Sequence, residues 1–381
     1  MKNRLFLLMA AAAVSVPVIA QSSELRVGYT NDALTLDPHN HRNRTTQTII
    51  RNMYDGLVTR DPNMKVVPQL AEYLKVINPT TYEVKLQVGA KFHDGSPITA
   101  EDVKFTFERL TKDGAVSGKT SPRKSLVGPV VGIDVIDSRT AQIKLKTPWP
   151  QFPAFLTLHE IVSKKFTEAQ GNDGLGTKVM GSGPFKLAAW RKGDSVIMER
   201  FDDYYGGSPA LKPHAKACSE RVIFKIIPEN ASRVAALLSG DVDLINDLPA
   251  HSVNQVKANP NTDVVSANGT RSYFIAMNAE TGPFKDKRVR QAVSHALDKQ
   301  LIIDRIMGGN GEQIDGLLSP DAFGKNTNLP RLGYDPAKAK SLLAAAGHSD
   351  GIDVVLDVKG SLKEIAEAIA SLLTKSGIRT K

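Results

Sequence analysis

The clearest alternation of apolar and polar residues lies in the segment TYEVKLQV, residues 81–88. Tyr82, Val84, Leu86 and Val88 occupy one face of an extended chain, and the residues between them are polar. A period of two residues is typical of a β-strand with one buried face. The segment therefore predicts a half-buried strand whose four apolar side chains face the core.

A helix follows this strand after a short polar turn. Thr99 is suited to cap the helix, and Asp102 stands three residues later, which is the spacing of a capping box with a shortened acidic side chain. Val103, Phe107 and Leu110 then recur along one side. The pattern predicts an amphipathic helix that begins after Thr99.

The turn before this helix contains His93, Asp94 and Ser96, which are the residue types of a hydrolase triad. Gly95 among them is suited to the positive φ of a tight turn. A triad requires each side chain to point at the next, and three residues of one turn cannot do so. We interpret the three as turn residues and expect no catalytic residue.

Strand and helix patterns alternate along the rest of the chain. The predicted elements are strands at residues 221–227 and 241–245, a helix at 230–239 and two helices that begin at Asp286 and Asp298. Residues 265–278 join two such regions and are the candidate crossover between lobes. This alternation predicts an α/β fold throughout.

The end of the sequence predicts a strand at residues 352–358, an amphipathic helix at 362–374 and a short second strand at 378–381. Two parallel strands joined by a helix form a βαβ unit. We expect such a unit here, with its second strand cut short and its apolar faces lacking partners.

The first residues have the features of a secretory signal peptide. Lys2 and Arg4 precede an apolar run at residues 5–16, which is too short to span a membrane, and Ala20 ends a small-residue cleavage site. We expect cleavage between Ala20 and Gln21 and a periplasmic product. Because no cysteine starts the mature chain, a lipid anchor is not expected there.

Composition limits the remaining functions. The chain has 381 residues and 41% hydrophobic content, which is enough for more than one lobe. Its net charge is +9, but the basic residues are scattered, so nucleic acid is not an expected partner. Cys218 is the only cysteine, which excludes an intramolecular disulfide.

Three local patterns resemble known sites without matching them. Residues 114–120 (GAVSGKT) have one residue too few for a phosphate-binding loop. His159 begins a zinc-protease pattern, but Ser163 stands where the second histidine belongs. His39 and His41 form an H-x-H pair in a polar loop, where we expect them to be solvated. No metal and no cofactor is expected.

Six segments together resemble one protein family. They are LDPHN (36–40), YDGLVTRDPNMKVVPQLAE (54–72), VKLQVGAKFHDGSPITAEDVKFTFERL (84–110), GSGPFKLAAWRKGDSVIMERFDDYYGG (181–207), IIPENASRVAALLSGDVDLI (226–245) and YFIAMNAETGPFKDKRVRQAVSHALDKQLIIDRIMGGNG (273–311). In this order they are similar to the bacterial extracellular solute-binding proteins of family 5, the dipeptide- and oligopeptide-binding components of ABC importers.

The resemblance implies a two-lobed periplasmic binding protein of the type II-like class. Lobe I would span residues 21–265, including an inserted α/β subdomain, and residues 266–381 would form a partial lobe II. Family members usually continue well beyond this length, and the further part usually carries an acid that binds the amino terminus of the peptide. We therefore expect lobe I to be well folded, lobe II to be incomplete and locally unstable, and ligand affinity to be low.

The resemblance also implies a function, namely capture of peptides between the lobes and delivery to an ABC permease. Nickel complexes, sugars or opines are alternative ligands, and a periplasmic hydrolase is the alternative class. We expect a monomer. A guanidinium such as that of Arg271 can bind a carboxylate with two hydrogen bonds, although each candidate below has the alternative role of a turn or edge-strand residue. The candidate ligand-binding residues are Asn31, Asp32, Thr35, Gly181, Ser182, Gly183, Arg271, Ser272 and Tyr273.

Overall fold

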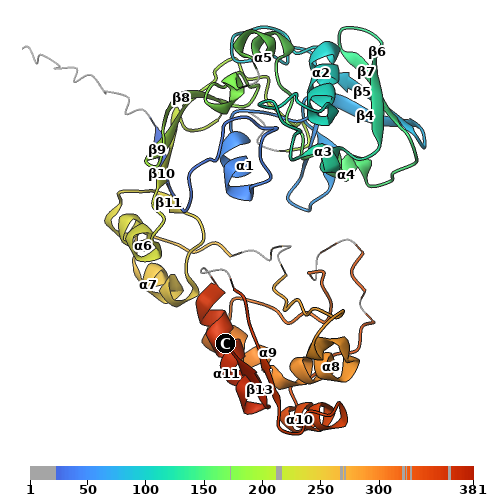
Figure 1. Ribbon diagram of the computed structural model, residues 1–381. Helices are drawn as coiled ribbons and strands as arrows, with labels where there is room; N and C mark the ends of the chain where they lie inside the picture. The colour runs from blue at the N-terminus through green and yellow to red at the C-terminus, as the bar shows by residue number, and fades with distance from the viewer. Residues whose placement is uncertain are drawn as a thin grey trace, which may run out of the picture. The chain divides into compact units, whose positions relative to one another are not determined.

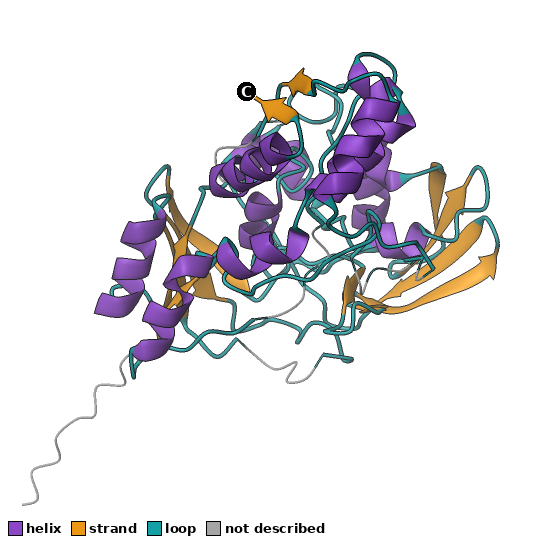
Figure 2. Cartoon of the chain, turned by 90° about the horizontal axis from the view of Figure 1, so that it is seen from below, coloured by secondary structure: helices purple, strands orange, loops and turns teal. Residues whose placement is uncertain are grey.

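The structure is a computed structural model that describes residues 23–171, 173–211, 217–266, 269, 272–319, 322, 324–326, 328–358 and 362–381. The chain forms two compact units, one up to Asn246 and one over Asp247–Lys381. Both units combine helices with strands (Figures 1 and 2), as the α/β prediction requires. The division falls nearer the N-terminus than the lobe boundary predicted after residue 265.

The first unit contains a five-stranded sheet in the order β11-β1-β10-β9-β8. β1 is parallel to β10 and β11, whereas β9 is antiparallel to β10 and β8. The core beside this sheet includes the buried side chains of Val27, Ile49, Met198 and Phe224. The elements are β1 (Glu24–Tyr29), α1 (Arg44–Ile50), β8 (Phe185–Arg191), β9 (Ser195–Arg200), β10 (Arg221–Ile226), α6 (Asn230–Ser239) and β11 (Leu244–Ile245).

The predictions for this sheet are largely confirmed. α6 has the predicted bounds, and Gly240 after it adopts a left-handed φ of 78°, the usual conformation of a glycine that ends a helix. β10 is present, but β11 is shorter than the predicted strand 241–245. The reason is that the amides of Asp241 and Val242 both donate to the Ala236 carbonyl of α6, so these residues turn back to the helix.

A second, antiparallel sheet of the first unit has the order β4-β5-β7-β6. Its strands and helices lie in the sequence between β1 and β8 and enclose a separate core that includes Val84, Phe107, Ile143 and Phe152. Figure 2 shows the strands in separate groups and not in one continuous sheet. The elements are β2 (Val58–Arg60), β3 (Val66–Pro68), β4 (Ala71–Asn78), β5 (Thr81–Leu86), α2 (Ala100–Thr111), α3 (Lys124–Val127), β6 (Val130–Val135), β7 (Thr140–Leu145), α4 (Phe152–Leu156), α5 (Lys164–Gln170) and η1 (Gly174–Gly176).

The strand and capped helix predicted here are confirmed, with one correction. In β5, Tyr82, Val84 and Leu86 are buried, but Val88 is 78% exposed. β5 ends at Leu86, and Val88 belongs to the turn that follows, so strand alternation no longer places its side chain. At the start of α2, the Asp102 carboxylate accepts hydrogen bonds from the Thr99 amide at 2.9 Å and hydroxyl at 2.8 Å.

The second unit has its own core, which includes Val289, Val293, Leu343, Leu373 and Ile378. Asp286 and Asp298 cap α8 and α9 as predicted. β12 and β13 are parallel and joined by α11, which confirms the βαβ unit, although β12 is shorter than predicted. The expected instability of this region stays a prediction. The elements are η2 (Ala250–Ser252), α7 (Val253–Ala258), η3 (Pro283–Lys285), α8 (Lys287–Ala296), α9 (Lys299–Arg305), α10 (Pro336–Ala345), β12 (Ile352–Val354), α11 (Lys363–Lys375) and β13 (Ile378–Thr380).

Candidate functional site

The parallel strands β11, β1 and β10 end at the same edge of the first sheet. In α/β proteins, ligands bind in the crevice outside the carboxyl ends of such strands. Three segments leave this edge, namely residues 30–35 after β1, residues 227–229 after β10 and the chain from Asn246 after β11. They form the candidate ligand-facing part of the first unit.

The segment after β1 contains three of the predicted ligand-binding residues. Asn31 is exposed, and its side-chain amide donates to the Thr30 hydroxyl at 3.2 Å. Asp32 is half-buried, with one carboxylate oxygen accepting from the Trp190 indole at 2.9 Å and the other from the Gly193 amide at 2.8 Å. Asp32 therefore attaches the segment to the turn between β8 and β9. Its ligand role stays a prediction.

Thr35 has a local contact as well. Its hydroxyl accepts from the Asp37 amide at 3.1 Å, and the side chain is half-buried. Leu34 beside it is 70% exposed. In this segment, Asn31 and Leu34 thus present the most accessible side chains, whereas Asp32 and Thr35 hold the backbone in place.

Arg233 of α6 is a residue at this edge that the sequence interpretation missed. Its side chain is fully buried at 0% exposure. The guanidinium donates to the backbone carbonyls of Asn246 at 3.1 Å, Ile227 at 3.0 Å and Pro228 at 3.3 Å, and to the Asn230 side chain at 2.8 Å. Arg233 therefore links the segments that follow β10 and β11.

The second predicted segment, residues 181–183, is packed against the backbone after α1. Ser182 is fully buried and accepts from the Asp55 amide at 3.2 Å, and the Gly183 amide donates to the Met53 carbonyl at 2.9 Å. A Cβ atom on Gly181 would lie 1.8 Å from the Met53 carbonyl oxygen. Close backbone packing therefore explains the small residues, and their ligand role stays a prediction.

His93 fixes the same segment. Its Nδ1 accepts from the Gly181 amide at 3.3 Å, so its Nε2 carries the proton and donates to the Gly183 carbonyl at 3.1 Å. Burial lowers the pKa of His93 to about 4. The residue does lie in a turn, as predicted, but the turn also holds a segment ninety residues away in sequence.

A buried carboxylate lies beside this segment. Asp55 is 1% exposed and accepts hydrogen bonds from the Gln69 amide at 2.6 Å, the Tyr205 hydroxyl at 2.8 Å and the Tyr204 hydroxyl at 3.1 Å. Burial raises the pKa of Asp55 to about 7, while the two phenol donors act in the opposite direction. We call these four residues the Asp55 cluster.

The first half of another buried cluster contains Asp37, His39 and Arg109. The Arg109 guanidinium binds the Asp37 carboxylate with two hydrogen bonds, at 2.6 and 3.0 Å, and donates to His39 Nδ1 at 2.9 Å. His39 Nε2 therefore carries the proton and donates to the Glu160 carbonyl at 3.0 Å. Burial and the adjacent Arg109 charge keep the pKa of His39 well below its usual range.

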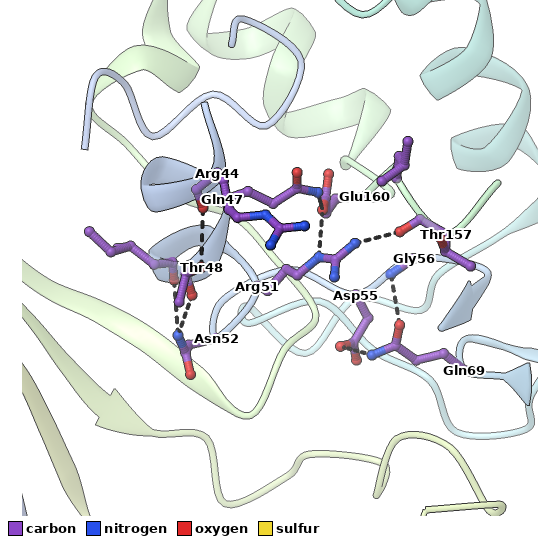
Figure 3. A network of polar contacts seen from close by, with 12 residues as sticks. Arg44, Gln47, Thr48, Arg51, Asn52, Asp55, Gly56, Gln69, Thr157 and Glu160 are labelled. Atoms are coloured by element: carbon purple, nitrogen blue, oxygen red, sulfur yellow. Dashed lines mark hydrogen bonds and ion pairs between the residues drawn. The ribbon is translucent and has the colours of Figure 1, made fainter. Parts of the chain in front are cut away.

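Its second half contains His41, Arg123 and Glu160. Arg123 donates to the Glu160 carboxylate and to His41 Nε2, both at 3.2 Å. The other carboxylate oxygen of Glu160 accepts from Gln47 at 2.8 Å and contacts the partly exposed Arg51 at 3.5 Å (Figure 3). Figure 3 also shows Asp55 with Gln69 nearby. We call the six residues Asp37, His39, His41, Arg109, Arg123 and Glu160 the ion-paired cluster.

This geometry corrects one prediction. His39 and His41 are 0% and 3% exposed, not solvated. The polar sequence around the two histidines indicated exposure to solvent. Their charged partners, however, come from α2, the 121–123 segment and residue 160, which are distant in sequence. Over the part of the chain that the structure describes, no group of three or more His, Cys, Asp or Glu residues could hold a metal.

The other predicted site residues belong to the second unit or lie outside the described residues. Ser272 is half-buried, and Tyr273 is 48% exposed. Arg271 and the predicted cleavage residues Ala20 and Gln21 lie outside the described residues. Within the described ranges, no helix combines the length and the apolar character needed to cross a membrane.

Comparison with known proteins gives one consistent assignment. Residues 65–381 match the family described as bacterial extracellular solute-binding proteins, family 5 middle. The glutathione-binding protein GsiB of Pectobacterium atrosepticum is 29% identical over 351 residues, which cover 91% of this chain and 65% of GsiB. The chain thus spans slightly less than two thirds of that relative.

Two solved structures are similar over most of the chain. The periplasmic binding protein DppA from Helicobacter pylori, in complex with the peptide STSA, is 26% identical with a TM-score of 0.81, over 94% of this chain and 73% of DppA. AgaA from A. tumefaciens R10, in complex with agropinic acid, is 29% identical with a TM-score of 0.76, over 94% of this chain and 72% of AgaA.

Proposed function

The chain belongs to the bacterial extracellular solute-binding proteins of family 5, and from this membership we propose that it captures peptides in the periplasm and delivers them to an ABC permease. The resemblance found in the sequence is thereby confirmed at the level of the family. The observation that carries the choice of ligand is the similarity to DppA in complex with a peptide. Cleavage of the signal peptide before Gln21 and a monomeric state belong to the same proposal.

The arrangement of the first unit supports binding without catalysis. The exposed Asn31 stands at the carboxyl edge of three parallel strands, where its polar side chain is available to a ligand. Extended peptides bind largely through main-chain hydrogen bonds, and water fills the space around varied side chains. Both ring nitrogens of His93 bind the backbone of residues 181 and 183, while the Ser96 hydroxyl donates to Asp94. The turn therefore lacks the geometry of a hydrolase.

An opine is the second candidate ligand, because AgaA in complex with agropinic acid is also similar to this chain. An acid and a peptide both carry a carboxylate, which a guanidinium can bind with two hydrogen bonds. The candidate residues of the first unit do not distinguish the two ligands.

Mass spectrometry of the purified full chain tests the proposal directly. We expect any molecule that co-purifies to be a peptide, and calorimetry with the tetrapeptide Ser-Thr-Ser-Ala to give weak binding at one site without hydrolysis of the peptide. Stronger binding of agropinic acid than of the tetrapeptide would replace the proposed ligand class. Hydrolysis that disappears in the Ser96→Ala variant would replace the function itself.

A further inference from the structure

Arg233 places a charged side chain fully inside the first unit, at the edge where the parallel strands end. Its aliphatic part lies beside Gly28 of β1, where a Cβ atom would be 3.3 Å from the Arg233 Cγ. Its guanidinium contacts the carbonyls of Ile227, Pro228 and Asn246. One side chain therefore fixes the chain just after two parallel strands, β10 and β11.

Asn246 extends this contact to the segment after β1. Its side-chain oxygen accepts from the Thr30 amide at 3.3 Å, and its side-chain nitrogen donates to the Thr30 hydroxyl at 3.5 Å. The same hydroxyl accepts from the side-chain amide of the exposed Asn31 at 3.2 Å. Arg233 is thus connected through Asn246 and Thr30 to the candidate ligand-facing residue Asn31.

Asn246 is also the last residue of the first compact unit. Asp247 after it has a φ of 51°, a conformation that is uncommon for residues other than glycine and that aspartate tolerates better than most. A backbone held in this conformation requires support from its surroundings. The hydrogen bond from Arg233 to the Asn246 carbonyl, directly before Asp247, provides part of that support.

We propose that Arg233 is a positioning residue for ligand binding, an inference that rests on the proposed function. It would hold residues 30–35 and the chain around Asn246 in a binding-competent arrangement without contacting the ligand itself, since its side chain is 0% exposed. The planar guanidinium directs several donors at once, which a lysine ammonium cannot reproduce. The proposed role therefore requires the geometry of the Arg233 guanidinium and not only its charge.

Arg123 offers a matched control within the same unit. It is also buried, at 1% exposure, and it also donates to backbone carbonyls, those of His41 and Leu158. However, its contacts belong to the ion-paired cluster and not to the edge formed by β1, β10 and β11. A purely structural role for buried arginines predicts the same behaviour for Arg233→Lys and Arg123→Lys.

The experiment compares these two variants in the full chain, at a temperature where both are folded. Hydrogen exchange is followed at the amides of residues 30–35 and 246–248, and calorimetry measures binding of the tetrapeptide Ser-Thr-Ser-Ala. For Arg233→Lys we expect exchange in these segments to be roughly tenfold faster and peptide affinity roughly tenfold weaker, as the loss of hydrogen bonds from a charged donor allows. Arg123→Lys should leave both quantities within about twofold of the unmodified chain.

Equal exchange and equal affinity in the two variants would overturn the proposal. If the unmodified chain does not bind the tetrapeptide, the proposed ligand is wrong, while the exchange measurement still decides the role of Arg233. Should Arg233→Lys fail to fold, Asn246→Ala removes the connection to Thr30 and leaves Arg233 in place. This variant should accelerate exchange at residues 30–35 to a similar degree, and unchanged exchange there would also contradict the proposal.

Discussion

Two buried clusters of the first unit hold carboxylates in different ways. In the ion-paired cluster, Asp37 and Glu160 each contact a buried arginine, Arg109 and Arg123. In the Asp55 cluster, the donors to the carboxylate are one amide and two phenols. Burial is similar in both, since Asp37 and Asp55 are each 1% exposed. The difference between them lies in how the charge is compensated.

This difference predicts two kinds of sensitivity. A buried ion pair is costly to break, because removal of one partner leaves the other charge buried without compensation. A buried carboxylate whose donors are neutral has no opposite charge beside it, so burial raises the pKa of Asp55 to about 7. Asp55 can therefore take up a proton near neutral pH. We therefore expect the ion-paired cluster to respond to mutation and the Asp55 cluster to respond to pH.

The largest effect should follow from Arg109→Leu. The Asp37 carboxylate would lose its bidentate partner while it stays buried, and the free energy of unfolding should fall by about 3–5 kcal/mol. Denaturation in urea at pH 7 measures this. The double variant Asp37→Asn with Arg109→Leu removes both charges and should be less destabilised than the single variant. A loss below about 1 kcal/mol in Arg109→Leu would show that this pair is not the compensation that we infer.

The Asp55→Asn variant isolates the pH response. The pKa of Asp55 is raised from 3.8 to about 7 on folding, so the folded state binds the proton more tightly. The resulting stabilisation is fully present below about pH 4 and is lost as the pH rises through 7, on the order of 4 kcal/mol in total. The difference in unfolding free energy between the unmodified chain and Asp55→Asn should fall by this amount between pH 4 and 8.

The buried histidines make the unfolding free energy change with pH in the opposite direction. Comparison with Asp55→Asn is needed because both proteins contain these histidines, so their contribution cancels in the difference. The pKa of His41 is lowered to about 4, mainly by burial and then by Arg123. The unfolded chain takes up that proton near pH 6.5, so stability is lost as the pH falls from 6.5 towards 4. If the difference in unfolding free energy between the unmodified chain and Asp55→Asn does not change with pH, the pH response does not come from Asp55.

The smallest effects should distinguish His93 from Ser96, two residues of the same turn. His93→Ala removes both contacts of the ring to residues 181 and 183 and should cost about 1–3 kcal/mol of unfolding free energy. Ser96→Ala removes only an exposed contact to Asp94 and should stay within about 0.5 kcal/mol. Thermal unfolding of the two variants side by side measures the difference. Equal effects would show that the ring contacts contribute little, as a simple turn residue would.

The sequence by itself determined the local elements and the family. The helix at residues 230–239, the capping of α2 by Thr99 and Asp102, and the succession of strand, helix and strand at the end of the chain all depend on neighbouring residues, which a single sequence displays. The family could also be identified from the sequence, because the six motifs and their order are visible in it. Val88 shows the limit of this approach, because alternation does not reveal where a strand ends.

Only the tertiary structure decided the environment of the polar side chains. Nothing near His39 or His41 in the sequence indicates that Arg109 and Arg123 will meet them in a buried cluster. Arg233 likewise appears as one more basic residue on a helix until β1, β10 and β11 bring their ends together around it. Burial and pairing of charges depend on contacts between residues far apart in the chain, and local pattern carries no information about those contacts.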